Sequence, residues 1–277
     1  MGASPTKPIF NLERGGAPLL ISLPHAGAEY PPEVAAAWTE AARLLPDTDW
    51  FLADIYDFAR ALDVTLLGAR WSRYVIDLNR PPDDAPLYAQ ANQTELCPTR
   101  MFDGQPIYVA GKAPSADEIA RRRDNYWRPY HDALEQELAR LQARHGYVIL
   151  WEGHSIKSEL PWLFEGKLPD LNLGTADGRS CSQALRQALS DALAAQSLFT
   201  YVVDGRFKGG YITRHYGRPM AGRHAVQLEM SWSCYMAETP PYVIDAARLE
   251  RLRPVLQALL ETALRWKPSD DDRCFPT

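Results

Sequence analysis

The 277-residue sequence predicts a single α/β domain, a three-layer α/β/α sandwich around a mostly parallel or mixed sheet, spanning residues 1–277. Short apolar segments typical of strands alternate along the chain with amphipathic segments typical of helices. No internal repeat or low-complexity linker divides the chain, and its length suffices for one sizeable core. Several apolar segments end in polar side chains, and ligands bind at that edge of an open α/β sheet.

The expected strands are short runs rich in leucine, isoleucine and valine. The most informative run covers residues 147–151, because it leads directly into Glu152 and His154. An apolar run entered from a glycine is typical of a buried strand that delivers polar side chains to its C-terminal edge. The full set of expected strands covers residues 18–23, 64–67, 74–78, 147–151, 200–203 and 225–228.

Helices are expected between these runs. Ser115 and Glu118 form a capping box that opens the longest helix, which ends near Gly146. Further helices are expected at about 33–45, after a break at 46–49, through Leu185, Leu189 and Leu193, and at about 246–266. Irregular excursions are expected at about 81–114 and 157–178, with a polar loop at 209–217. Loops of this length in compact domains are usually functional.

Composition excludes some classes of partner. The formal charge of −5 and the scattered Lys and Arg residues leave no basic face for nucleic acid, so a small-molecule substrate is expected. No window approaches the roughly 18 uninterrupted apolar residues of a membrane span. The four cysteines lack Cys-x-x-Cys spacing and the start lacks a secretory pattern, which favours reduced thiols in a cytoplasmic protein. The sequence carries no feature that sets an oligomeric state.

Two histidines and a glutamate stand at the ends of expected strands. His25 and His154 are the histidines that follow an apolar run and enter a glycine-containing loop, and Glu229 follows the 225–228 run. Two imidazoles, a carboxylate and an open water position make a hydrolytic Zn²⁺ site. The alternative is that each histidine is a hydrogen-bonded residue at a strand end. The spacing alone favours neither interpretation.

The third ligand has more than one candidate. Asp49 at the start of a helix and Glu29 beyond His25 both qualify, while Glu152 is suited to orienting a ligand. Helix capping is the alternative role for Asp49, and a solvated surface position is the alternative for Glu29. Of the other histidines, His131 and His145 are expected on a helix surface, and His215 and His224 in loops that could line the pocket.

Arginines gather in the segments that hold these residues. Asn79 and Arg80 follow the expected strand at 74–78, and a guanidinium fork beside an amide suits a carboxylate. A substrate with more than one anionic group fits this chemistry, although surface ion pairs are the alternative. The candidate substrate-binding residues are Arg73, Asn79, Arg80, Arg214 and, in the 209–217 loop, Tyr211, with Arg223 as a weaker candidate.

Two family resemblances emerge from these segments. Residues 75–80, 153–155 and 227–229 resemble the Asp-Leu-Asn-Arg, second-histidine and general-base segments of zinc carboxypeptidases. A closer resemblance, to the N-formylglutamate amidohydrolases of histidine degradation, covers about residues 8–266. Its matching segments are 24–27 with 30–31, 47–50, 72–80, 151–156, 210–217 and 227–231.

The resemblance implies a zinc-carboxypeptidase-like fold that hydrolyses N-formyl-L-glutamate, a small dicarboxylic amide, to formate and L-glutamate. It implies one Zn²⁺ per chain held by His25, His154 and Asp49, with Glu229 as general base and arginines on the substrate carboxylates. Ala28 stands where the carboxypeptidase pattern has its second ligand, so Asp49 is preferred and Glu29 kept as the alternative. Other possible functions are deacylation of other N-acyl amino acids, a carboxypeptidase-like activity or, from a different class, metal-free binding.

Overall fold

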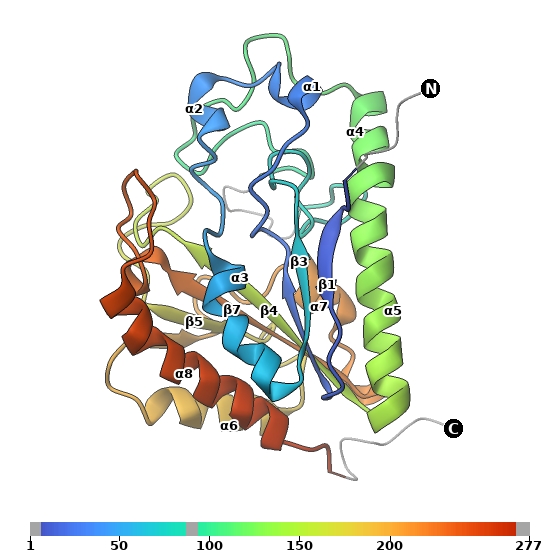
Figure 1. Cartoon of the computed structure of the whole chain (residues 1–277), viewed down its shortest axis with the longest axis vertical. Helices are drawn as coiled ribbons and strands as arrows, with labels where there is room; N and C mark the ends of the chain where they lie inside the picture. The colour runs from blue at the N-terminus through green and yellow to red at the C-terminus, as the bar shows by residue number, and fades with distance from the viewer. Residues whose placement is uncertain (1–6, 87–93, 270–277) are drawn as a thin grey trace.

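The computed structural model describes residues 7–86 and 94–269, and these residues form one mixed sheet of seven strands (Figure 1). The strand order is β1-β3-β2-β4-β7-β5-β6. β3, β2, β4 and β7 run parallel, whereas β1 and β5 lie antiparallel to their neighbours β3 and β7, and β6 runs parallel to β5. The strand bounds are β1 Phe10–Glu13, β2 Leu19–Leu23, β3 Thr65–Ala69, β4 Val148–Ile156, β5 Leu171–Gly174, β6 Tyr201–Val203 and β7 Arg223–Ser231.

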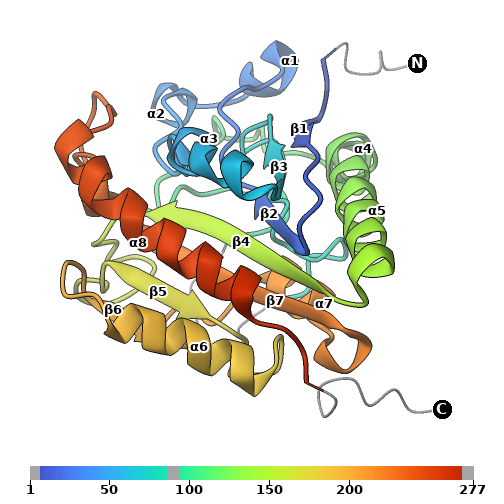
Figure 2. The same ribbon diagram turned by 60° about the horizontal axis from the view of Figure 1, so that its bottom comes forward.

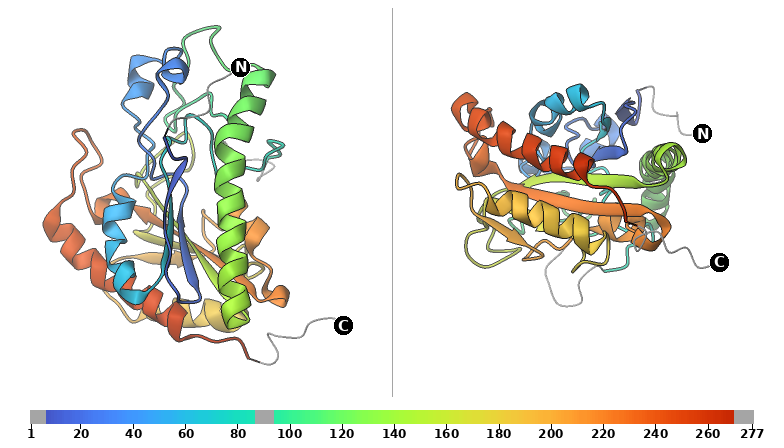
Figure 3. Two further views of the ribbon diagram at one scale, coloured as in Figure 1. Left: turned by 45° about the vertical axis from the view of Figure 1, so that its right-hand side comes forward. Right: turned by 90° about the horizontal axis from the view of Figure 1, so that it is seen from below.

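Helices cover both faces of the sheet, which confirms the expected three layers. The 3₁₀ helix η1, α3, α6 and α8 pack on one face, and the long α4–α5 helix and α7 pack on the other (Figures 2 and 3). Side chains of β2 alternate between two cores: Leu19 and Ile21 lie in the core shared with α6 and α8, and Leu20 lies in the core shared with α5. The bounds are α3 Leu52–Ile55, η1 Asp57–Leu62, α4 Ala116–Arg122, α5 Arg128–His145, α6 Gln183–Ala194, α7 Tyr211–Tyr216 and α8 Ala246–Arg265.

The longest helix begins and ends at the expected residues but contains an irregularity. The Ser115 hydroxyl accepts from the Glu118 amide at 3.3 Å, and Gly146 ends the helix with a positive φ of 78°. Between α4 and α5, residues Arg123–Trp127 form a π-helical turn, η2. Such turns concentrate at functional sites.

Some sequence predictions are wrong. Residues 74–78 are turns and irregular backbone rather than a strand. Val75 and Ile76 are buried in the same cluster as residues of the long helix, and they pair with no strand. The helix expected at 33–45 is two short helices, α1 (Pro32–Ala35) and α2 (Glu40–Arg43), and the loop expected at 209–217 contains α7. β1 was not expected, and β5 lies inside the excursion expected at 157–178. Part of the 81–114 excursion, residues 87–93, and Cys274 lie outside the described residues; Cys97, Cys181 and Cys234 are buried free thiols.

Among the described residues, the search for a helix both long and apolar enough to span a bilayer finds none.

Candidate metal and substrate site

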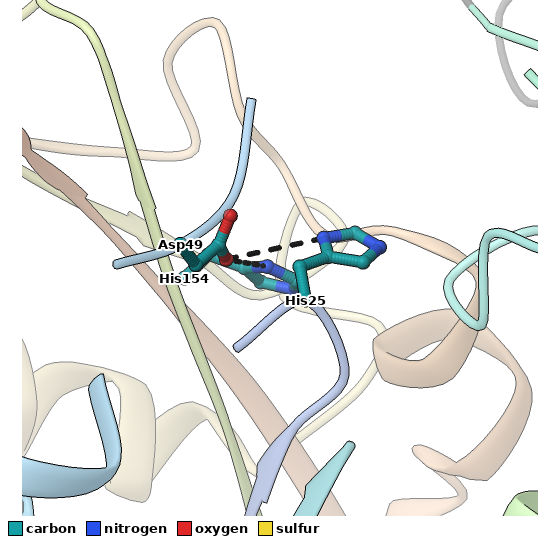
Figure 4. A group of neighbouring side chains, drawn as sticks. All are labelled: His25, Asp49 and His154. Carbon is teal, nitrogen blue, oxygen red and sulfur yellow. Dashed lines mark hydrogen bonds and ion pairs between the residues drawn. The ribbon is translucent and has the colours of Figure 1, made fainter. Parts of the chain in front are cut away.

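A buried cluster of His25, Asp49 and His154 lies at the C-terminal end of the parallel strands (Figure 4). One ligand atom from each residue falls within 4.8 Å of the others. His154 Nδ1 lies 2.9 Å and His25 Nδ1 3.9 Å from the same oxygen, Asp49 Oδ2. The structure therefore brings together three side chains that are far apart in the sequence.

Asp49, and not Glu29, completes this cluster. Glu29 pairs at the surface with Lys7 at 2.7 Å and Arg70 at 2.9 Å. Asp49 does not cap a helix, since the N-cap of α3 is Phe51 and this helix has no side-chain capping hydrogen bond. Asp49 Oδ2 instead accepts from the Ser155 amide at 3.2 Å, which fixes the carboxylate against β4.

A carboxylate behind each histidine sets which ring nitrogen carries the proton. His25 Nε2 lies 2.6 Å from Asp77, and His154 Nε2 lies 2.7 Å from Glu152. A carboxylate accepts hydrogen bonds, so each Nε2 carries a proton. A metal ion in the cluster would take each Nδ1 as a ligand, replacing the 2.9 Å bond between His154 Nδ1 and Asp49. Carboxylate–histidine pairs of this kind orient zinc ligands, and two imidazoles with one carboxylate form a common zinc donor set. The residues present therefore fit a metal ion.

The electrostatics of the cluster also favour a cation. Burial lowers the pKa of His154, but hydrogen bonds to Asp49 and Glu152 outweigh burial and raise that pKa well above its ordinary value. The carboxylates that favour a proton on His154 would favour a metal cation in the same place. At His25, burial and the charge of Arg73 lower the pKa, which favours the neutral, ligating imidazole.

Asp77 is a site residue that sequence reasoning missed, because it was assigned to the interior of a strand. Besides His25, Asp77 accepts from Arg73 Nη2 at 2.7 Å and from the Asn79 amide at 2.8 Å. Burial raises the pKa of Asp77, but His25 and Arg73 outweigh burial and hold that pKa well below its usual range. Its position within an Asp-x-Asn-Arg segment was the signal that could have identified it.

Glu229 lies on the same side of the sheet as the cluster. It pairs with His154 in the register of β7 and β4, and both strands continue beyond these residues, so neither is a strand end. Burial raises the pKa of Glu229 to about 8, against the opposing effect of His154. A carboxyl group whose pKa approaches neutrality is suited to taking up and returning a proton.

These side chains open onto a cavity with an empty volume of about 680 Å³, which includes solvent at its mouth. That volume is within the range of small-molecule sites. Of the predicted substrate residues, Arg73 and Arg80 line it, and Arg73 also lies 4.5 Å over the Phe102 ring. Arg206 lines it as well and was missed, because the polar loop was taken to begin only at Gly209.

Asn79 lies behind the cluster rather than in the cavity lining. Its Nδ2 is 3.1 Å from His154 Nε2, and its Oδ1 accepts from the Ile212 amide at 2.9 Å. Gly210 must be a glycine at this point, since a Cβ there would lie 2.3 Å from the Asn79 amide. Asn79 therefore connects α7 to the His154 ring.

The remaining predicted residues lie away from the cavity. Arg214 donates to the Gly209 carbonyl at 2.8 Å and lines a separate small cavity. Tyr211 and His215 stack on each other, with ring centroids 4.9 Å apart. Arg223 pairs with Glu135 at 2.8 Å, at the opposite end of β7 from Glu229.

Two further histidine assignments are wrong, besides that of His215, which lies in α7. His224 is buried in β7, where its Nδ1 accepts from the Ser182 amide at 3.1 Å, so it does not lie in a pocket loop. His131 is buried rather than on a helix surface. Its Nε2 donates to the Leu78 carbonyl and its Nδ1 bonds the Tyr216 hydroxyl, each at 2.9 Å.

His131 belongs to a group of side chains on the long helix that hold residues 75–82 in place. Arg122 donates to the Val75 carbonyl at 3.1 Å, and Trp127 Nε1 donates to the Arg80 carbonyl at 2.9 Å. Trp127 lies in the π-helical turn, so this irregularity helps to fix the segment that carries Asp77.

The chain matches the N-formylglutamate amidohydrolase family over residues 17–236. It is 50% identical over 258 residues to an N-formylglutamate deformylase of Pseudomonas aeruginosa, covering 93% of this chain and 97% of the relative. A deformylase of the same name from Pseudomonas putida is 48% identical, covering 93% of this chain and 96% of that relative.

Two solved structures are similar to this chain. The crystal structure of an N-formylglutamate amidohydrolase from Ralstonia eutropha JMP134 superimposes with a TM-score of 0.77 and 26% identity, covering 92% of this chain and 95% of that one. An Agrobacterium tumefaciens protein, at 19% identity and a TM-score of 0.71 over 92% of this chain and 94% of its own, shares the fold. By the family match and the two Pseudomonas relatives, the chain belongs to the N-formylglutamate amidohydrolase family.

Proposed function

We propose that the protein is an N-formylglutamate deformylase, which hydrolyses N-formyl-L-glutamate to formate and L-glutamate in the cytoplasm. The observation that carries the proposal is the buried His25–Asp49–His154 cluster beside Glu229, in a cavity that arginines line. Family membership and relatives of the same activity support the substrate.

A Zn²⁺ ion would be held by the Nδ1 atoms of His25 and His154 and by the Asp49 carboxylate. When bound, it would supply a Lewis acid for the formyl carbonyl and lower the pKa of water. Asp77 and Glu152 would keep the two rings in the ligating tautomer.

Glu229 moves the proton in this mechanism. As the water oxygen bonds to the formyl carbon, Glu229 accepts the proton that the water loses. When the carbon–nitrogen bond breaks, Glu229 returns that proton to the leaving amine, giving formate and glutamate. Burial raises the pKa of Glu229 to about 8, which favours the return of the proton to the amine. A cation held in the cluster would lower this pKa and so favour the base step.

Arg73 and Arg80 position the substrate. Arg73 is fixed by Asp77 and lies 3.1 Å from His25 Nδ1, beside the place where the formyl group would react. Arg80 donates through Nε to the Thr94 carbonyl at 2.8 Å, which orients its guanidinium at the cavity wall. A guanidinium fork held in this way can position a carboxylate, and positioning lowers the entropic barrier to reaction.

The test combines metal analysis with an acyl-group comparison. After loading with zinc, the protein is expected to retain one zinc ion per chain. It is also expected to hydrolyse N-formyl-L-glutamate in preference to N-acetyl-L-glutamate. Faster turnover of the acetyl substrate would instead identify a deacylase of larger N-acyl amino acids. A protein that neither retains metal nor hydrolyses either substrate would be a binding protein on this scaffold.

A further inference from the structure

Arg206 is a cavity-lining cation that the catalytic scheme above does not use. It follows β6, and its Nη2 donates to the Leu163 carbonyl at 3.0 Å. Its guanidinium carbon lies 5.3 Å from the centroid of the Phe207 ring. A backbone carbonyl and an aromatic ring thus fix a half-buried guanidinium at the wall of the cavity.

This wall differs in chemistry from the metal-ligand end. Leu163 and Phe207, which contact Arg206, line the cavity with Ile156, so this wall carries apolar side chains beside the charge. Arg73, by contrast, contacts Asp77, His25 and Asp49. The cavity therefore combines an arginine within the metal-binding cluster with another on an apolar wall.

The proposed substrate likewise has one carboxylate near the reacting group and another beyond an apolar chain. Its α-carboxylate is attached to the carbon next to the amide nitrogen, close to the reacting formyl group. Its side-chain carboxylate lies beyond two methylene groups. Apolar wall residues suit the methylene groups, and an arginine on that wall suits the distal carboxylate, because charge-assisted contacts gain strength away from water.

We propose that Arg206 binds the side-chain carboxylate and is the residue that selects dicarboxylic N-formyl substrates. This inference rests on the proposed deformylase function. It adds Arg206 to the arginines expected on the substrate carboxylates, among which the sequence suggested Arg214, a residue that lines a different cavity.

The experiment compares N-formyl-L-glutamate with N-formyl-L-glutamine, which has the same length but a neutral side-chain amide. In Arg206→Ala, kcat/KM for N-formylglutamate should fall about ten- to a hundred-fold, as expected for a lost charge-assisted contact. For N-formylglutamine it should change less than about threefold, so the preference for the charged substrate disappears. Arg206→Lys should restore only part of that preference, because an ammonium lacks the planar fork.

Arg179→Ala is the control, since it removes the same charge from an exposed position outside this cavity. It should keep the wild-type preference. Zinc content and thermal melting of each variant identify any general loss of structure. If Arg206→Ala does not fold, Arg206→Gln replaces it, because its amide can still donate to Leu163.

The two proposals fail in different ways. A wild-type enzyme that does not hydrolyse N-formylglutamate overturns the deformylase function, and the assignment of Arg206 with it. A wild-type enzyme that prefers N-formylglutamate, together with an Arg206 variant that keeps this preference, overturns the assignment of Arg206 alone.

Discussion

The site has two walls that are built in different ways. On the strand wall, β4 and β7 carry Glu152, His154 and Glu229, and continuous pairing aligns His154 with Glu229. On the loop wall, residues 72–82 carry Arg73, Asp77 and Asn79 without any strand pairing. The long helix holds these residues in place through hydrogen bonds to backbone carbonyls, such as those from Trp127 to Arg80 and from His131 to Leu78.

This difference between the walls indicates which property a mutation in each wall should affect. In a strand, side chains two residues apart share a face, so the ladder itself aims Glu152 and His154 together. In the loop, the geometry depends on buried donors that must each find a carbonyl, and every one lost leaves a buried polar group unsatisfied. Mutations on the strand wall should therefore affect chemistry first, and mutations supporting the loop wall should also affect stability.

The largest effect is expected from His154→Ala on the strand wall. Removing one of three ligands should abolish stable zinc binding and with it activity. Zinc stoichiometry and kcat measured on one sample check this. A variant that keeps full zinc occupancy would exclude His154 as a ligand.

Glu229→Gln should have the next largest effect. The swap is almost isosteric, but an amide cannot accept the proton of water, so kcat should fall about a hundred- to ten-thousand-fold with zinc content unchanged. A kcat within about tenfold of wild type would contradict the role as base. Lost zinc would instead make Glu229 a ligand.

Asp77→Asn and Glu152→Gln compare the two walls directly. Each replaces the acceptor behind one histidine, so zinc affinity in a chelator competition should fall about ten- to a hundred-fold in both. The loop-wall variant should also melt at a clearly lower temperature, because it leaves the buried Arg73 without its close anionic partner. Equal Tm values in the two variants would contradict the difference proposed between the walls.

Sequence reasoning predicted the strand wall better than the loop wall. The runs before Glu152 and Glu229 are buried strands, and their apolar pattern follows from pairing on both sides within the sheet. The long helix was predicted from local signals, Ser115 at one end and Gly146 at the other, which need no tertiary information.

The loop wall could not be predicted in the same way. Val75 and Ile76 are as apolar as a strand because the helix buries them, and a sequence pattern records burial without recording pairing. Arg206 was missed because its place at the cavity depends on Leu163, which is distant in the sequence. Arg214 and Arg223 also belong to the segments in which arginines gather, but they lie outside the cavity. Residue type alone therefore did not identify the arginines that line it.

The smallest effect on activity, and a distinct effect on stability, is expected from His131. Burial lowers the pKa of His131 to about 3, against the opposing effect of its bond to the Leu78 carbonyl, whereas an unfolded histidine has a pKa of about 6.5. Between these values the unfolded chain binds a proton that the folded chain does not. The contribution of His131 to stability is therefore full above about pH 6.5 and is lost as the pH falls towards 3.

His131→Gln should be less stable than wild type at pH 7.5 by about 1–3 kcal/mol, because it disturbs the bonds to Leu78 and Tyr216. Glutamine does not titrate, so this gap should narrow by about 2 kcal/mol between pH 7.5 and pH 5. Denaturant unfolding of both proteins at each pH measures it, and effects of pH on the zinc ligands cancel in the difference. His145→Gln, a change at the half-buried end of the same helix, is the control. A gap that stays constant with pH would show that the folded protein protonates His131 as readily as the unfolded chain does.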